Sequence, residues 1–378
     1  MSHSTQYQNE LIKRKFFTYL KNSKGFSDNS IQSFESALWL WEEFFQHPEL
    51  TSFNQTKAVD FKDWLKAKKK RQSTQAVSLS YCYDNLRYLR TFFEWLSHQL
   101  FCKGKINFTD IEYLNLTKKE SRAIRAPHAK KFPTLENIQS VIENILPITE
   151  VDRRDKALLS LTFLTGARIT ALASLPVQSF DSEDLTIDQN PKLGVKTKFS
   201  KRIVTALIPF SYKEPLQYFI DWVTYLKEVK KFQPTDPLFP ATKRENGQEA
   251  LGYYSTGKVE PIFWKSSSSP RKIFEKRFQS ANVPYFHPHT FRHLLVKEIS
   301  KIPLTEEEKK AISQNLGHDN VGTTFGSYGY GGISEQRQVE IVKNISFDGK
   351  AREVKYMLSK EEIKELVKTA VEEKSTNI

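Results

Sequence analysis

The sequence contains a series of polar residues whose types suit chemistry on a phosphate. The series consists, in chain order, of Arg168, His289, Arg292, His318 and Tyr328. An arginine fork binds two non-bridging phosphate oxygens and stays charged, whereas histidine and tyrosine can move a proton or attack phosphorus. Each residue alone is weak evidence, because an H-x-x-R pair or a Gly-His step occurs in many chains. Their combination and order predict metal-free phosphoryl transfer.

Rigid elements are expected next to these residues. The apolar segment 152–164 predicts a buried helix that Gly166 ends, so that Arg168 follows the end of a core helix. Thr134 is expected to cap the helix before it, and a further helix begins at Phe291. Side chains carried by such elements are aimed more accurately than side chains on long loops.

Between these helices the pattern changes to short runs of the β type. Three apolar runs with turn residues between them predict a small antiparallel sheet inserted among helices. They span residues 185–187, 193–195 and 203–209. Helices are expected again at about 213–229 and 270–280, whereas the polar residues 241–269 predict a long surface loop.

The amino-terminal residues 7–100 predict helices. Ser27 and Asn54 are expected to cap two of them, and a third is expected from about Ser73 to Leu100. Aromatic residues recur at helical spacing, which favours a bundle core over a base-stacking surface. The basic run Lys68, Lys69, Lys70 and Arg71 follows the second helix. This run is either a solvated helix end or a contact to a DNA backbone.

Residues 101–131 lose the helical periodicity. Their last part, 118–131, is basic and has few apolar residues, which predicts a linker between two domains. Arg122 and Arg125 lie in it, and their charge would suit a segment that follows phosphates. A plain tether is the alternative interpretation.

Composition limits the class of protein. The 378 residues suggest two or three domains, and 57 Lys and Arg against 44 Asp and Glu give a net charge of +13. Such a basic balance favours polyanionic partners. The two cysteines form no C-x-x-C motif, and the first residues contain no apolar signal core. We expect a soluble cytoplasmic protein without a membrane partner.

The order Arg168, lysine, His289-x-x-Arg292, His318, Tyr328 resembles the signature of the tyrosine recombinase (phage integrase) family. The resemblance covers about residues 132–345 and, in type, the helical region before them. It implies a mainly α fold with a small antiparallel β-sheet: a helical core-binding domain followed by an α+β catalytic domain. The expected parts are a DNA-binding domain 1–117, the linker 118–131, the catalytic domain 132–345 and a tail 346–378, whose helix would contact a neighbouring protomer.

The resemblance also implies roles. Arg168 and Arg292 would neutralise the transition state, His289 would assist deprotonation of Tyr328, and His318 would bond a phosphate oxygen. Lys198, on a hairpin turn, would protonate the 5′-oxygen, with Lys196 as the alternative. The products would be a 3′-phosphotyrosyl link and a 5′-hydroxyl, formed without metal, ATP or another cofactor. The implied partners are double-stranded recombination sites, three further protomers in a tetramer on DNA, and accessory DNA-bending or directionality factors of a mobile genetic element.

Two departures from the family pattern leave alternatives open. Ala171 stands where an acidic residue is usual, and Tyr328 is the tenth residue after His318 rather than the ninth, which is Ser327. Tyr330 is therefore a rival nucleophile. A DNA-binding accessory protein that lost catalysis is a second hypothesis. A metal-dependent nuclease is a third, and its ligands would be His287, His289, His293 and Asp319.

Overall fold

A computed structural model describes residues 3–125, 131–208, 210, 212–246 and 253–326. The chain divides into two compact units, Met1–Pro127 and His128–Ile378, and each has its own hydrophobic core. The described part is mainly helical and carries small antiparallel sheets, as the sequence predicted. None of its helices is both long and apolar enough to span a membrane.

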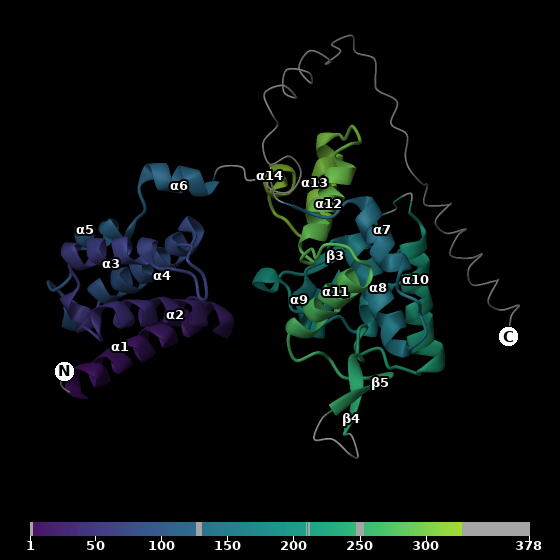
Figure 1. The fold of residues 1–378 in the computed structure, drawn as a ribbon, viewed down its shortest axis with the longest axis horizontal. Helices are drawn as coiled ribbons and strands as arrows, with labels where there is room; N and C mark the ends of the chain where they lie inside the picture. The colour runs from purple at the N-terminus through teal and green to yellow at the C-terminus, as the bar shows by residue number, and fades with distance from the viewer. Residues whose placement is uncertain (1–2, 126–130, 209, 211, 247–252, 327–378) are drawn as a thin grey trace, which may run out of the picture. The chain divides into compact units, whose positions relative to one another are not determined.

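The first unit is a helical bundle (Figure 1). Ser27 and Asn54 cap α2 and α3 through their side chains, as predicted, because each accepts the backbone N–H three residues on. Trp41 lies in the core with 1% of its surface exposed, and its ring is 5.1 Å from that of Phe61 and 5.0 Å from that of Phe93. The aromatic stripes are therefore core, as expected. The elements are α1 (His3–Asn22), α2 (Asp28–Phe45), η1 (Leu50–Ser52), α3 (Gln55–Ala67), α4 (Leu79–Ser97), η2 (Leu100–Cys102), α5 (Phe108–Ile111), η3 (Glu112–Leu114) and α6 (Lys118–Arg125).

Only the first residue of the basic run belongs to a helix end, because Lys68 is the C-cap of α3 and Lys69, Lys70 and Arg71 lie beyond the helix. Helix α3 ends at Ala67, and residues 68–77 form a short antiparallel turn in which Lys69 pairs with Ala76. Helix α4 begins at Leu79 instead of near Ser73. Ser78 caps this helix through its side chain, and residues 68–76 offer few apolar side chains to extend either helix into the core.

Residues 118–125, expected to belong to an aperiodic linker, form helix α6. Its start is fixed because Glu120 accepts hydrogen bonds from the backbone N–H and the hydroxyl of Thr117, both at 2.8 Å. Glu120 also pairs with Lys66 of α3 at 2.6 Å, and Ile124 packs against the core of the first unit. These contacts attach α6 to the bundle. Residues 126–130 lie outside the described residues.

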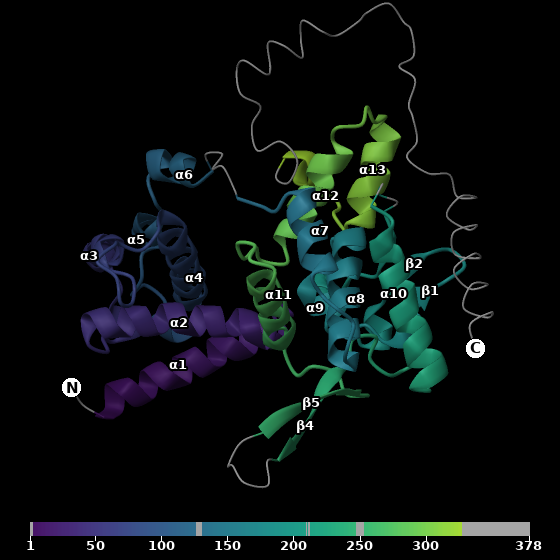
Figure 2. The ribbon, with the colours of Figure 1, turned by 45° about the vertical axis from the view of Figure 1, so that its right-hand side comes forward.

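The second unit is organised around α8 (Figures 1 and 2). Helix α8 is buried along almost its whole length, and Gly166 ends it in a left-handed turn, as predicted. Thr134 and Thr149 open α7 and α8 with capping boxes. Its helical elements are α7 (Leu135–Glu143), α8 (Glu150–Thr165), α9 (Ile169–Leu172), η4 (Val177–Ser179), η5 (Pro191–Leu193), η6 (Lys198–Ser200), α10 (Glu214–Thr224), η7 (Tyr225–Val229), α11 (Ser268–Ser280), α12 (Thr290–Ile299), α13 (Glu306–Asn315) and α14 (Val321–Thr324).

A three-stranded sheet lies among these helices, with its strands in the order β1-β2-β3. Both strand pairs are antiparallel, which confirms the predicted sheet. The predicted run 193–195 is not a strand, because the chain turns there through η5 and the left-handed Gly194. The strands are β1 (Phe180–Asp181), β2 (Thr186–Gln189) and β3 (Ile203–Ala206).

Residues 241–269 are not a loop, which is a second correction. Strands β4 (Ala241–Asn246) and β5 (Tyr253–Glu260) pair there as an antiparallel hairpin that projects from one end of the second unit (Figure 1). Polar groups of α8 hold its base. Arg154 donates to the hydroxyl of Thr242 at 2.9 Å, and Glu150 accepts from the backbone N–H of Val259 at 2.8 Å.

Candidate active site

Arg292 is the buried centre of the candidate site. It lies on α12 with 2% of its surface exposed. Its Nε donates to the carbonyl of Gly166 at 3.0 Å, and its Nη1 donates to Nε2 of His318 at 3.0 Å. An arginine held at two points of its fork loses little conformational freedom when it binds an anion.

The end of α8 approaches α12 closely because residue 166 is glycine. Gly166 has φ +57°, and a Cβ there would lie 2.7 Å from Cδ1 of Leu295 and 3.5 Å from Cα of Arg292. Arg168 follows as the N-cap of α9. Ala171, which stands where the family signature has an acid, is buried with 1% exposed. The turn therefore brings the Arg168 backbone beside the helix that carries Arg292.

His318 is held by a chain of hydrogen bonds. Its Nε2 accepts from Arg292, because a guanidinium can only donate, so its Nδ1 carries the proton. Nδ1 lies 2.8 Å from the hydroxyl of Thr324, which donates to the hydroxyl of Ser313 at 2.9 Å. Ser313 in turn donates to the carbonyl of Asn320 at 3.3 Å. The chain fixes both the ring orientation and the tautomer of His318.

Two histidines of the site are neutral at pH 7. Burial, and after it the charge of Arg292, lower the pKa of His289 and of His318 to about 4. Arg168 also lowers both values, and Lys198 contributes to the shift at His318. Desolvation and positive neighbours disfavour the imidazolium form. The predicted residues Arg168, Lys198, His289, Arg292 and His318 thus share one electrostatic environment.

The lysines lie on the segment between β2 and β3. Lys198 is exposed, and its ammonium lies 4.8 Å from the centre of the Phe199 ring. Phe199 has φ +59° and 85% of its surface exposed. Lys201 pairs with Asp319, the residue after His318. Lys196 is also exposed, and its backbone N–H donates to the hydroxyl of Ser174 at 2.8 Å.

The other predicted residues lie in several places. Among the predicted DNA contacts, Lys69, Lys70, Arg71 and Arg122 are exposed on the first unit. Lys68 is held differently, because its ammonium pairs with Glu43 at 2.9 Å and lies 4.4 Å from the centre of the Trp64 ring. Arg125 ends α6, and Tyr328 and Tyr330 lie outside the described residues.

Sequence reasoning missed Ser313, Thr324 and Asn315, which contact the histidine or the strand beside it. Serine, threonine and asparagine are ordinary residues at helix ends, and nothing in their spacing sets these apart. Their part in the site depends on how α13 and α14 fold against β3.

The described residues contain no group of three or more His, Cys, Asp or Glu side chains that could hold a metal ion. Of the ligands named for a nuclease, His293 is buried and its ring stacks on Phe132 at 6.1 Å. Asp319 pairs with Lys201.

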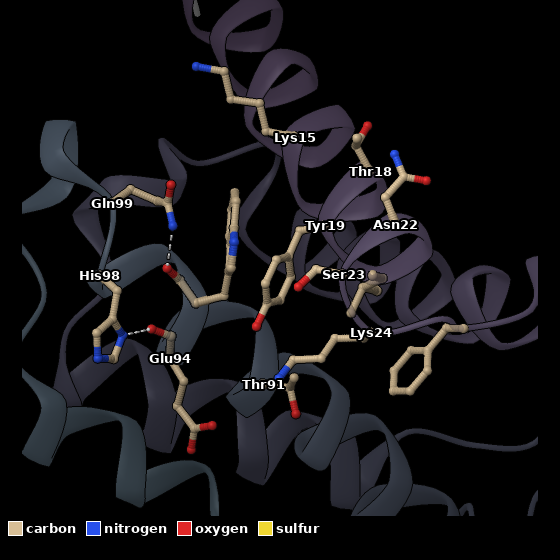
Figure 3. A pocket seen from close by; sticks show the side chains of 13 residues that line it. Lys15, Thr18, Tyr19, Asn22, Ser23, Lys24, Thr91, Glu94, His98 and Gln99 are labelled. Carbon is tan, nitrogen blue, oxygen red and sulfur yellow. Dashed lines mark hydrogen bonds between the residues drawn. The ribbon is translucent and has the colours of Figure 1, made fainter.

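A separate groove of about 1030 Å³ lies in the first unit between α1 and α4 (Figure 3). Tyr19 and Trp95 line it, with their ring centres 6.2 Å apart. His98 and Gln99 at its edge bond the backbone of α4, to the carbonyls of Glu94 and Trp95. Within the described part of the chain, none of the predicted catalytic residues lines this groove.

Comparison with known proteins gives a consistent result for both units. Residues 134–329 match the phage integrase family, and residues 14–99 match the N-terminal SAM-like domain of phage integrases. The tyrosine recombinase XerD of Oceanobacillus iheyensis is 22% identical over 316 residues, which cover 82% of this chain and 90% of that protein. The chain belongs to the phage integrase family of tyrosine recombinases.

Solved structures share the fold. XerH site-specific recombinase, bound to palindromic difH substrate in a post-cleavage complex, superposes with a TM-score of 0.53 at 16% identity and covers 88% of this chain and 83% of that one. A lambda integrase dimer bound to a COC′ core site superposes with a TM-score of 0.52 at 13% identity and covers 92% of this chain and 99% of that one. These likenesses support the same mainly helical architecture with small sheets.

Proposed function

We propose that this protein is a site-specific DNA recombinase that cleaves and rejoins strands through a 3′-phosphotyrosyl intermediate. The observation that carries the proposal is the buried Arg292, held between the carbonyl of Gly166 and a neutral His318. The charges of Arg168 and Lys198 lower the pKa of the same histidine, so several cations lie near one site. Such a cluster suits a phosphodiester, whose charge grows in the transition state.

The proposed step conserves atoms and charge. The phenol oxygen of Tyr328 bonds to phosphorus while the bond from phosphorus to the 5′-oxygen breaks. His289 takes the phenol proton, and Lys198 gives a proton to the departing 5′-oxygen. Arg168 and Arg292 bind the non-bridging oxygens. The bond energy stays in the phosphotyrosyl link, so the reverse attack by a 5′-hydroxyl rejoins a strand.

A bound phosphate would change the protonation of the two histidines. An anion close to the ring favours the imidazolium form and raises the pKa from about 4. His289 would thereby become a better proton acceptor than in the DNA-free protein. His318 would gain a proton on Nε2, with which it could donate to a phosphate oxygen.

Binding and assembly form the second part of the proposal. Lys69, Lys70, Arg71, Arg122 and Arg125 would contact DNA phosphates, and two domains, 1–117 and 132–345, would bind the duplex together. Four protomers would assemble on two sites, with the tail 346–378 contacting a neighbour. Accessory DNA-bending or directionality factors would act with the tetramer, in the cytoplasm. The structures of XerH and lambda integrase with DNA support the choice of partner.

Covalent capture tests the proposal. The full chain is incubated in EDTA with nicked duplexes of randomised sequence, and adducts that survive SDS are isolated and sequenced. A phosphotyrosyl adduct that maps to Tyr328 is expected. Tyr328→Phe should bind the selected site normally and form no adduct, whereas Tyr330→Phe should still form one.

The other outcomes separate the alternatives. An adduct at Tyr330 would move the nucleophile and keep the enzyme class. Sequence-specific binding without any adduct would indicate the accessory DNA-binding protein. Cleavage that appears only when EDTA is left out and a divalent metal is added would indicate the metal-dependent nuclease.

A further inference from the structure

Strand β3 is tied to the end of helix α13 by one side chain. Asn315 accepts from the backbone N–H of Ala206 at 2.7 Å and donates to the carbonyl of the same residue at 3.1 Å. The side-chain amide thus pairs with β3 as the peptide group of a fourth strand would. Because β3 lies at the edge of its sheet, these backbone groups have no partner strand among the described strands of the sheet β1-β2-β3.

Further contacts strengthen this connection. The hydroxyl of Thr205, fully buried, accepts from Gln189 of β2 at 2.8 Å and donates to the backbone carbonyl of Asn315 at 3.0 Å. Beyond it, Gly317 lies so close to Ile203 that any Cβ would overlap the isoleucine side chain. The sheet edge and the end of α13 therefore form one packed body.

This connection joins two halves of the candidate site. On one side, β3 begins at Ile203 directly after the segment that carries Lys198. On the other side, Asn315 precedes Leu316, Gly317 and His318, and His318 bonds Arg292. A shift of β3 along α13 would move the lysine relative to the arginine and histidine.

We propose that Asn315 is a positioning residue that sets the distance of Lys198 from the phosphate site. The inference rests on the proposed function, in which Lys198 protonates the 5′-oxygen. A misplacement of about 1 Å can slow an oriented reaction about 100-fold, so we expect a smaller loss from one relaxed contact, about tenfold. Asn315 itself touches no reacting atom and acts through the strand.

A substrate with a 5′-bridging sulfur separates positioning from a general structural role. Its leaving group needs no proton, so its cleavage does not depend on the place of Lys198. Full-length Asn315→Ala is assayed for adduct formation on the captured site, made once with the normal phosphate and once with the sulfur at the cleaved bond. The matched control is Gln314→Ala, an exposed residue of the same helix, and Lys198→Ala is the reference.

We expect Asn315→Ala to be about tenfold slower on the normal site and as fast as the unmodified protein on the sulfur site. Gln314→Ala should form the adduct as fast as the unmodified protein on both the normal and the sulfur site. The double variant Lys198→Ala, Asn315→Ala should be no slower than Lys198→Ala alone. Asn315→Asp, which keeps the acceptor for the Ala206 N–H but loses the donor, should show a partial defect and provides the test if the alanine variant unfolds.

The failures are distinguishable. If sulfur rescues Lys198→Ala but leaves Asn315→Ala slow, Asn315 serves the fold or His318, and the inference is wrong while the proposed function stands. Full activity of Asn315→Ala on the normal site would also show that the inference is wrong while the proposed function stands. If sulfur does not rescue Lys198→Ala, the lysine is not the general acid, and both the assigned role and the inference fall.

Discussion

Gly317 is a position where the structure allows the cost of one added methyl group to be worked out. Its φ is +70°, and an alanine Cβ would overlap Cδ1 of Ile203 and lie 3.1 Å from Cγ1 and 3.4 Å from Cγ2. A left-handed alanine costs about 1–2 kcal/mol. Overpacking against a buried side chain adds about 1–3 kcal/mol, because Ile203 is only 5% exposed and has little room to move. Gly317→Ala should therefore lower the free energy of unfolding by about 2–5 kcal/mol.

Two further variants separate the cost of the left-handed backbone from the cost of overpacking. Gly194 has φ +82°, and a Cβ added there would meet nothing within 4 Å, so Gly194→Ala should show the backbone cost alone. Ile203→Val removes Cδ1 and normally costs about 0.5–1.5 kcal/mol. In the Gly317→Ala background it should be neutral or stabilising, because the overlap is relieved.

Chemical denaturation of the full chain is monitored with a probe located in the second unit. Calorimetry separates the unfolding transition of the second unit from that of the first. A Gly317→Ala cost equal to that of Gly194→Ala would refute the overlap. An Ile203→Val cost that is the same in both backgrounds would do so independently, since the two side chains would then not interact.

Two other predictions concern charge. Because the His318 pKa is about 4 in the fold and near 6.5 in the unfolded chain, the unfolded chain binds more protons between these values, and stability should fall as pH drops through this window. His318→Gln should reduce that slope in urea unfolding at pH 5 and 7, and an unchanged slope would assign it to other groups. Replacing Lys69, Lys70 and Arg71 by Gln should reduce the slope of log K for DNA against log salt by up to about 3. Lys68→Gln alone should change it little, because its ammonium already pairs with Glu43; a large change there would contradict this.

Local signals predicted much of the fold. The helix caps at Ser27, Asn54 and Thr134 and the stop at Gly166 were correct, because a cap depends on residues within one helical turn. The hairpin β4–β5 was missed because its strands are polar and its base is held by the distant helix α8.

The candidate site likewise has a part that the sequence pattern predicted and a part that depends on contacts between distant segments. The types and order of Arg168, His289, Arg292 and His318 predicted one shared site, and the structure brings these residues together with Lys198. Their catalytic roles stay predictions. Their nucleophilic partner Tyr328 remains a prediction. The hydrogen bonds that hold them run between segments far apart in the sequence, such as Asn315 to Ala206, and no local pattern marks such a pair.

The chain of hydrogen bonds from Arg292 through His318 and Thr324 to Ser313 runs in one direction from donor to acceptor. The guanidinium can only give a hydrogen bond, and every later member passes one on until the carbonyl of Asn320, which can only receive. A second proton on His318 occupies the nitrogen that receives from Arg292, so the ring cannot be protonated while that bond lasts. Charging of the histidine and release of the arginine from it are therefore a single event. An arriving phosphate diester, by attracting the arginine, would free Nε2 of His318, which would then take up a proton from the solvent.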